Sequence, residues 1–287
     1  MDNILEVKNL CKSYNEFKLN NVSFCLPRGS IMGFVGENGA GKSTTLKSIL
    51  NLLRPDSGEI TIFGTANTGL SARQKSDIGV VFDECHMHSP FTVKEVSSIC
   101  EGIYRDSWSS TTFFNYADSF KLTKGKKIKD YSRGMKMKLS LAIALSHNPK
   151  LLILDEATSG LDPVVRDEIL DIFLEFIQDE THSVLISSHI ISDLEKIADY
   201  ITMIHNGSII LMDTKDSLLE HYGVVHCLHT ELDKLDRQHI TGIRRNSFSC
   251  EVLIDNRNTF RPFGPNVLVD PATLEDIMLF KIKGGNL

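Results

Sequence analysis

Short apolar runs separated by polar turns occur along much of the chain, and they favour strands. These runs cover residues 4–7, 21–26, 30–35, 151–154 and 183–186. The third run leads into a glycine-rich loop and a helical pattern from about Lys42, and the last two are also followed by helical patterns. Continuous apolar runs suit parallel strands that are covered on both faces. We therefore expect an α/β fold with a mainly parallel sheet.

Residues 84–148 show a different pattern, because strand signals fade and apolar residues such as Val93 and Val96 recur at helical spacing. This region is expected to be a helical insertion. Farther along, residues 201–205 and 208–212 flank Asn206-Gly207, a pair that supplies the positive φ angles of a type I′ turn. A hairpin is therefore predicted, and it closes a first domain of residues 1–215.

Residues 216–287 are predicted to form a small α/β accessory region. Residues 248–254 alternate between apolar and polar side chains as in a strand. Asp270-Pro271 then resembles an N-cap followed by an N1 proline, which predicts a helix over residues 274–282.

Composition narrows the class of protein. The chain has 287 residues, a net charge of −6 and a pI near 5.9, which argues against nucleic acid as its main partner. No stretch approaches the roughly 18 apolar residues that suggest a membrane span, so any membrane role is expected to come through a partner. The six cysteines form no C-x-x-C pair and no signal peptide precedes them, so we expect reduced thiols in a cytoplasmic protein.

The glycine-rich loop carries the strongest motif. Residues 36–43 fit G-x-x-x-x-G-K-[ST] between a predicted strand and a predicted helix. Backbone amides of such a loop bind phosphate oxygens, while Lys42 is suited to the β- and γ-phosphates and Ser43 to Mg²⁺. The candidate nucleotide-binding residues here are Gly36, Asn38, Gly39, Ala40, Gly41, Lys42, Ser43 and Thr44.

Two other places suit anions or metal. Asp155 and Glu156 end a buried strand at the edge of the sheet where ligands of open α/β folds bind, so Asp155 is a candidate Mg²⁺ ligand and Glu156 a candidate base. An alternative is that Asp155 only caps the next helix. Ser132 and Gly134 precede an amphipathic helix over residues 136–146, and a helix N-terminus is a ready anion site.

Together these motifs resemble the nucleotide-binding domain of ABC transporters over residues 1 to about 215. The motif order is the same as in that family. The matching segments are Walker A (36–43), the signature loop (131–135), Walker B with its catalytic glutamate (Asp155, Glu156), the D-loop (159–162, ending at Asp162), the switch histidine (His189) and the adenine-stacking aromatic (Tyr14). Tyr14 as an ordinary strand-edge aromatic is the alternative.

The resemblance implies a P-loop NTPase core with an antiparallel β-subdomain. It also implies an ATPase that works as a dimer, either with a second copy or with a homologous subunit. ATP and Mg²⁺ on Lys42, Ser43 and Asp155 of one subunit would be completed by Ser132 and Gly134 of the other. Lys42, Glu156 and His189 would then act in hydrolysis. A separate membrane permease would dock near residues 83–90 and hold the ATPase at the cytoplasmic face of the membrane.

Two departures from the family pattern stand out. The signature loop has Arg133 and Met135 in place of a glycine and a glutamine, and Asp83 replaces the Q-loop glutamine. Asp83 is a candidate metal or nucleotide contact, with a simple turn cap as the alternative. These departures and residues 271–277 resemble the ABC-2-type group, which includes exporters of peptide antibiotics, lantibiotics and phenol-soluble modulins.

Two other functions remain open. One is a soluble ABC ATPase that acts on ribosomes or DNA, although such proteins usually have two ATPase domains or a long coiled coil. The other is a regulatory module that holds ATP without hydrolysing it, against which Lys42 and Glu156 argue. A metal site at Cys85, His86 and His88 is disfavoured because no fourth ligand has the usual spacing. The lysine-rich segment 121–129 reads as a solvated loop, with attraction to anionic lipid as the alternative.

Overall fold

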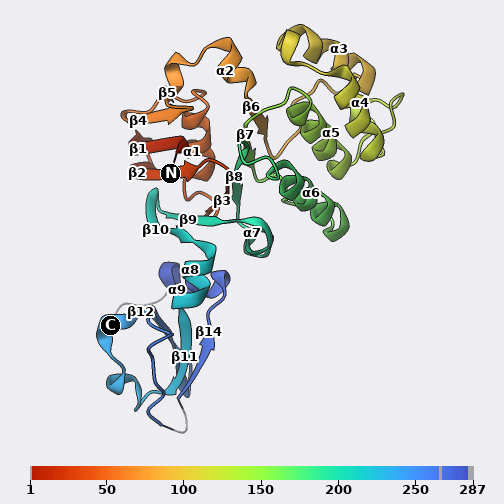
Figure 1. Ribbon diagram of the computed structural model, residues 1–287. Helices are drawn as coiled ribbons and strands as arrows, with labels where there is room; N and C mark the ends of the chain where they lie inside the picture. The colour runs from red at the N-terminus through yellow and green to blue at the C-terminus, as the bar shows by residue number, and fades with distance from the viewer. Residues whose placement is uncertain (1, 265–266, 284–287) are drawn as a thin grey trace.

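The structure is a computed structural model that describes residues 2–264 and 267–283. The strands of this part of the chain form three sheets (Figure 1). The central sheet has the order β10-β9-β3-β8-β7-β6 and is parallel except at its β9–β10 edge. Its strands are β3 (Ile31–Val35), β6 (Ile78–Val81), β7 (Leu151–Asp155), β8 (Ser183–Ser188), β9 (Tyr200–His205) and β10 (Ser208–Thr214). The expected mainly parallel sheet is confirmed.

The central strands are buried on both faces, as their continuous apolar sequences predict. In β3, Met32 and Phe34 face one apolar core, whereas Ile31 and Val35 face another. Phe34 packs on Phe24 with ring centroids 5.1 Å apart. This alternation fixes the register, because a shift by one residue would exchange the two faces.

An antiparallel sheet from the start of the chain covers the first of these cores. Its order is β2-β1-β4-β5. The strands are β1 (Asn3–Ser13), β2 (Lys18–Pro27), β4 (Ser57–Ile62) and β5 (Thr65–Ala66). Helix α1 (Lys42–Ile49) buries Leu46 and Ile49 in the same core. The short helix α2 (Ala72–Ser76) begins at a capping box of Ser71 and Gln74 and leads into β6. The phosphate-loop helix is thus held between two sheets.

The helical insertion consists of α3 (Val93–Tyr104), α4 (Ser110–Ser119) and α5 (Arg133–Leu145). Figure 1 shows these helices as a group beside the β6 and β7 edge of the central sheet. Phe113 is fully buried and lies 5.2 Å from the ring of Trp108. The insertion therefore has an apolar interior of its own that is continuous with the core against the sheet.

Helices α6 (Pro163–Phe176) and α7 (Ile191–Ile197) follow β7 and β8. The predicted hairpin joins β9 to β10, with Asn206 at φ 46° and Gly207 at φ 74°. A Cβ atom on Gly207 would lie 1.8 Å from the carbonyl oxygen of Lys18, so the turn excludes any side chain there. Glycine is required both by the φ angle and by the neighbouring strand.

The C-terminal sheet is antiparallel, in the order β12-β13-β11-β14. Its elements are α8 (Lys215–His221), β11 (Gly223–Leu228), β12 (Ile240–Arg245), β13 (Ser249–Ile254), β14 (Leu268–Pro271) and α9 (Leu274–Lys283). Helix α9 joins the main core through Ile277 and Phe280, in the same apolar cluster as Leu194 of α7. The backbone amide of Leu274 also donates to Glu195 Oε1 at 2.9 Å.

The start of α9 differs from the prediction. Asp270 and Pro271 pair with β11 as the end of β14, so they do not form the N-cap and first turn of the helix. Thr273 caps instead, because its Oγ1 accepts from the amide of Asp276 and the Asp276 carboxylate accepts from the amide of Thr273. This reciprocal pair satisfies two donors at the helix start.

Candidate active site

The phosphate loop joins β3 to α1 in a conformation that its glycines permit. Gly39 and Gly41 have φ angles of 83° and 115°, which side-chain-bearing residues rarely adopt. A Cβ on Gly36 would lie 2.5 Å from the carbonyl oxygen of Ile204, so that position is closed by the neighbouring strand. Ser43 is exposed in the first turn of α1. The first amides of α1 and the hydroxyl of Ser43 therefore lie together at the end of the loop.

Lys42 is buried, with 5% of its surface exposed, and its amine turns back toward the loop. Nζ donates to the carbonyl oxygen of Gly36 at 2.7 Å and to that of Glu37 at 3.3 Å. It also lies 3.0 Å from Glu156 Oε1, an ion pair that lacks hydrogen-bond geometry. Burial of this charge is compensated by the three oxygens around it.

Asp155 and Glu156 lie where β7 leaves the sheet. Asp155 is buried and accepts from Ser187 Oγ at 2.6 Å. Glu156 has a positive φ of 53°, and its amide donates to the carbonyl and hydroxyl oxygens of Ser187 at 3.1 and 3.2 Å. The hydrogen bonds to β8 hold this uncommon backbone geometry in place, and a non-glycine residue with such a φ is often found at a functional site.

His189 follows β8 and contacts the same glutamate. Its Nδ1 lies 2.6 Å from Glu156 Oε2. One carboxylate therefore bridges the buried amine of Lys42 and the imidazole of His189. These three side chains come from three separate loops at the carboxyl ends of parallel strands, which is where open α/β sheets bind ligands.

Ser132 and Gly134 lie apart from this cluster, at the start of α5. Ser132 is the N-cap and accepts from the amide of Met135 at 3.2 Å. The helix starts at Arg133, three residues before the predicted start at residue 136. A Cβ on Gly134 would meet Val165 of α6 at 3.2 Å. Within the part of the chain that the structure describes, the contacts of both residues are with α5 and α6 and not with the phosphate loop.

The segment after Glu156 is covered by the signature loop. Asp162 caps α6, accepting from the amide of Val165 at 3.1 Å. Gly160 has a φ of 68°, and a Cβ there would lie 2.6 Å from Nη1 of Arg133. The Arg133 guanidinium therefore packs directly on the Gly160 backbone.

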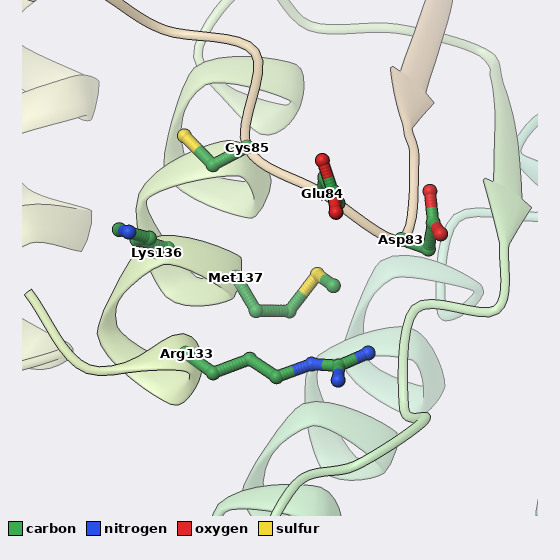
Figure 2. Close-up of a pocket in the computed structure, with 6 residues that line it drawn as sticks. All are labelled: Asp83, Glu84, Cys85, Arg133, Lys136 and Met137. Atoms are coloured by element: carbon green, nitrogen blue, oxygen red, sulfur yellow. The ribbon is translucent and has the colours of Figure 1, made fainter. Parts of the chain in front are cut away.

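Asp83 is exposed in the loop after β6, two residues beyond Val81, which pairs with Leu154 of β7 in the parallel sheet. It lines a cavity of about 450 Å³ together with Glu84, Cys85, Arg133, Lys136 and Met137 (Figure 2). The cavity lies between the loop that follows β6 and the first turns of α5. Its walls thus belong to the sheet on one side and to the helical insertion on the other.

Tyr14 is 49% exposed in the turn between β1 and β2. Its ring centroid lies 6.5 Å from that of Phe17. Phe17 in turn approaches the phosphate loop, since a Cβ on Gly41 would be 2.9 Å from its Cζ. The exposed aromatic ring therefore lies one side chain away from the phosphate loop.

Comparison with known proteins identifies the family. The family model described as "ABC transporter" matches residues 19–159. The chain is 36% identical to the lantibiotic transport ATP-binding protein SrtF of Streptococcus pyogenes, over 72% of this chain and 90% of that protein. This chain belongs to the ABC transporter family. It is an ABC ATPase, and ATP hydrolysis is the activity of the family.

Other relatives and solved structures agree with this assignment. The ABC ATPase is 34% identical to the bacitracin transport ATP-binding protein BcrA of Enterococcus faecalis, over 73% of this chain and 69% of that one. A solved ATP-binding subunit of an ABC transporter matches with a TM-score of 0.68 and 27% identity, covering 76% of this chain and 92% of the other. The ATP-binding cassette MJ0796, a dimer bound to ADP and Pi, matches with a TM-score of 0.65, 73% and 98% coverage and 22% identity, which supports the fold.

Two residues at the site of this ABC ATPase were not foreseen from the sequence. Ser187 orients both Asp155 and Glu156, and its only sequence signal is its position near the end of β8, two residues before His189. Phe17 lies between Tyr14 and the phosphate loop, with an aromatic side chain in a polar turn as its signal.

Cys100 and Cys227 are buried. Burial raises the pKa of Cys100 and of Cys227 to about 11, so both thiols stay protonated and unreactive at neutral pH. None of the helices within residues 2–264 and 267–283 combines the length and apolar character that crossing a membrane requires.

Proposed function

We propose that Lys42 and Ser43 bind the phosphates of ATP, and that Glu156 is the base that deprotonates the attacking water. The support is the position of Glu156 between Lys42 and His189. The amine of Lys42 would exchange its carbonyl partners for the more strongly negative oxygens of the β- and γ-phosphates. Glu156 would then be free to take a proton, while His189 keeps its carboxylate oriented.

The donor atoms near the loop also fit Mg²⁺. Ser43 offers a hydroxyl at the start of α1, and Asp155 offers a carboxylate that Ser187 orients. Magnesium prefers such hard oxygen ligands, together with substrate phosphates. The metal would neutralise phosphate charge during transfer. Asp83 is a further candidate ligand, because it follows β6, the strand that pairs with β7 and therefore lies beside Asp155.

ABC ATPase subunits dimerise, and we infer that two copies of this chain complete each other's site. Ser132 and Gly134 present a helix N-terminus, which suits an anion. Because they contact α5 and α6 rather than their own phosphate loop, a nucleotide on a second subunit is the ligand we assign to them. Asp162 and exposed Val164 at the start of α6 would lie in the same subunit interface.

ABC transporter ATPases work with membrane permeases, and the docking place that we propose is residues 83–90. Most of this segment is exposed, and it connects the sheet at β6 to the helical insertion at α3. A permease segment bound there would sense movement between the two. In this proposal residues 1–215 form the ATPase, with residues 84–148 as its helical part and 216–287 as an accessory region, held at the inner face of the membrane.

The transported substrate that we propose is a peptide antibiotic or a similarly amphipathic molecule, moved outward. The functions named for the relatives carry this proposal, since they include lantibiotic transport and bacitracin transport. The site itself handles only ATP and therefore contains no information on cargo.

The test is to express the chain together with a candidate permease in a sensitive bacterial host. Growth in lantibiotic-type peptides and ATPase activity of the purified complex are then measured. We expect tolerance and hydrolysis from the wild type and neither from Glu156→Gln. Hydrolysis with no permease association, and co-sedimentation with ribosomes instead, would favour the soluble ABC ATPase.

A further inference from the structure

The cavity beside the signature loop has opposite charges on its two walls. Asp83 and Glu84 come from the loop after β6, whereas Arg133 and Lys136 come from the first turns of α5. Figure 2 shows the Arg133 side chain extending from α5 toward the wall that carries Asp83, with Met137 beside it. The negative charges on the sheet side and the positive charges on the side of the helical insertion therefore face one cavity.

Neither Asp83 nor Arg133 makes a hydrogen bond or an ion pair with any described residue, in 2–264 or 267–283. By comparison, some other charged side chains of the helical insertion and of α6 are paired, such as Lys138 with Glu168. Both side chains are exposed, so solvent screens their attraction until the two walls of the cavity approach each other.

The position of Arg133 is fixed by the D-loop. Its guanidinium packs on Gly160, where a Cβ atom would come within 2.6 Å of Nη1. The aliphatic stem and planar head therefore span from the start of α5 to the segment that follows Glu156. A change in the position of α5 relative to β7 must move this guanidinium, and with it the distance to Asp83.

We propose that Arg133 is a positioning residue that rests on Gly160 and forms an ion pair with Asp83 when α5 moves toward the loop after β6. The pair would hold the helical insertion in the orientation that presents Ser132 to the nucleotide of the second subunit. This inference rests on the proposed function, because it assumes that Ser132 acts at a composite site. One contact would then account for Arg133 and Asp83, which both depart from the family pattern.

Asp83 is the partner we choose on geometric grounds. It follows β6 after a single residue, so the parallel sheet holds its backbone in place. An arginine head offers two parallel donors to a carboxylate, which makes such a pair both directional and strong. Lys136 lies one turn along α5 in the same cavity and provides a matched control, since Lys136→Ala also removes a positive charge there.

The test is a double-mutant cycle on the ATPase activity of the full chain. Asp83→Ala and Arg133→Ala should each lower kcat about 3- to 30-fold, with little change in KM for ATP. The kcat of the double variant should be no lower than that of the less active single variant. The exchanged pair Asp83→Arg with Arg133→Asp should recover at least half of the lost activity. Lys136→Ala should stay within about twofold of wild type.

A second measurement does not depend on turnover. In a Glu156→Gln background, ATP-induced dimerisation is followed by size-exclusion chromatography with light scattering. Arg133→Ala should weaken the dimer and the exchanged pair should restore it. Gly160→Ala, which displaces the guanidinium, should act in the same direction as Arg133→Ala.

The outcomes separate this inference from the proposed function. Independent, multiplicative losses, or an exchanged pair that is worse than both single variants, would overturn the ion pair. Loss on Asp83→Ala that extra Mg²⁺ repairs, whatever residue stands at 133, would overturn it in favour of metal binding. A wild-type chain without ATPase activity would instead overturn the proposed function and this inference with it.

Discussion

The amine of Lys42 lies 3.0 Å from Oε1 of Glu156, so the cation assigned to phosphate and the carboxylate assigned to water are paired with each other. The pair is largely buried, and breaking it without a replacement would leave a charge desolvated. In the proposed mechanism the phosphates of ATP would supply that replacement by binding the amine. Binding of ATP would then also release the base.

Glu156→Gln should preserve ATP binding and reduce turnover by about 10²- to 10⁴-fold, the usual loss when a positioned base is removed. The amide keeps the size of the side chain and can still contact His189, so the fold should be unaffected. Radiolabelled ATP binding and phosphate release measure the two effects. Turnover equal to that of the wild type would remove Glu156 from the mechanism.

A mixture of Lys42→Ala and Ser132→Arg subunits should regain activity that neither variant has alone. Each variant spoils both sites of a homodimer, but a mixed dimer has one site with an intact loop and an intact α5 N-terminus. Phosphate release is followed as the ratio of the two chains changes, with a maximum expected near equal amounts. Full activity of a monomer at any dilution would contradict the shared site.

His147 should make folding stability fall in mild acid. The ring is 2% exposed, stacks on Tyr104 at 4.2 Å and donates from Nδ1 to the carbonyl oxygen of Ser76 at 2.8 Å, while Nε2 has no hydrogen-bond partner among the residues that the structure describes. Burial lowers the pKa of this imidazole from its ordinary value of 6.5. The unfolded chain therefore takes up the proton first, so stability is complete above pH 6.5 and declines as the pH falls toward the lowered pKa.

Melting temperatures at pH 7.5 and 5.5 test the role of His147. His147→Gln should lower the melting temperature at pH 7.5, because ring stacking is lost, yet it should show a smaller further drop at pH 5.5 than the wild type. His221, which is exposed on α8, provides the control, and His221→Gln should leave the drop unchanged. An equal drop in all three proteins would assign the pH dependence to other groups.

Gly207→Ala should destabilise the chain by about 2 kcal/mol or more, because alanine is strained at φ 74° and its Cβ would collide with the backbone of Lys18. Gly102→Ala is the matched control. That glycine is exposed in α3 with no neighbour within 4 Å of a Cβ, so alanine there should stabilise by about 0.5–1 kcal/mol. Urea denaturation measures both changes.

Local patterns predicted the central sheet and the phosphate loop, because buried parallel strands and a glycine-rich turn each leave a signal within a few residues. The start of α9 was wrong for a local reason, since Asp270-Pro271 has the composition of a cap but pairs with β11. Thr273 and Asp276 satisfied the same helix amides.

Contacts between distant segments were not predictable in this way. The Lys42–Glu156 ion pair joins residues 114 positions apart, the difference between 156 and 42, and follows from the order of strands in the sheet. The packing of Arg133 on Gly160 depends on how α5 lies against the loop after β7. Single-sequence patterns specify elements, whereas these contacts arise from how the elements pack.

The junction of α9 with α7 has a consequence for any shortened version of the chain. Ile277 and Phe280 fill space beside Leu194, only five positions after His189. A chain cut at residue 215 would expose Leu194 to solvent and remove the Leu274 amide that donates to Glu195. Residues 1–215 and 216–287 are separate in the sequence, but side chains of both belong to one apolar core. Removal of the C-terminal region should therefore weaken the packing of α7, the helix that begins two residues after His189.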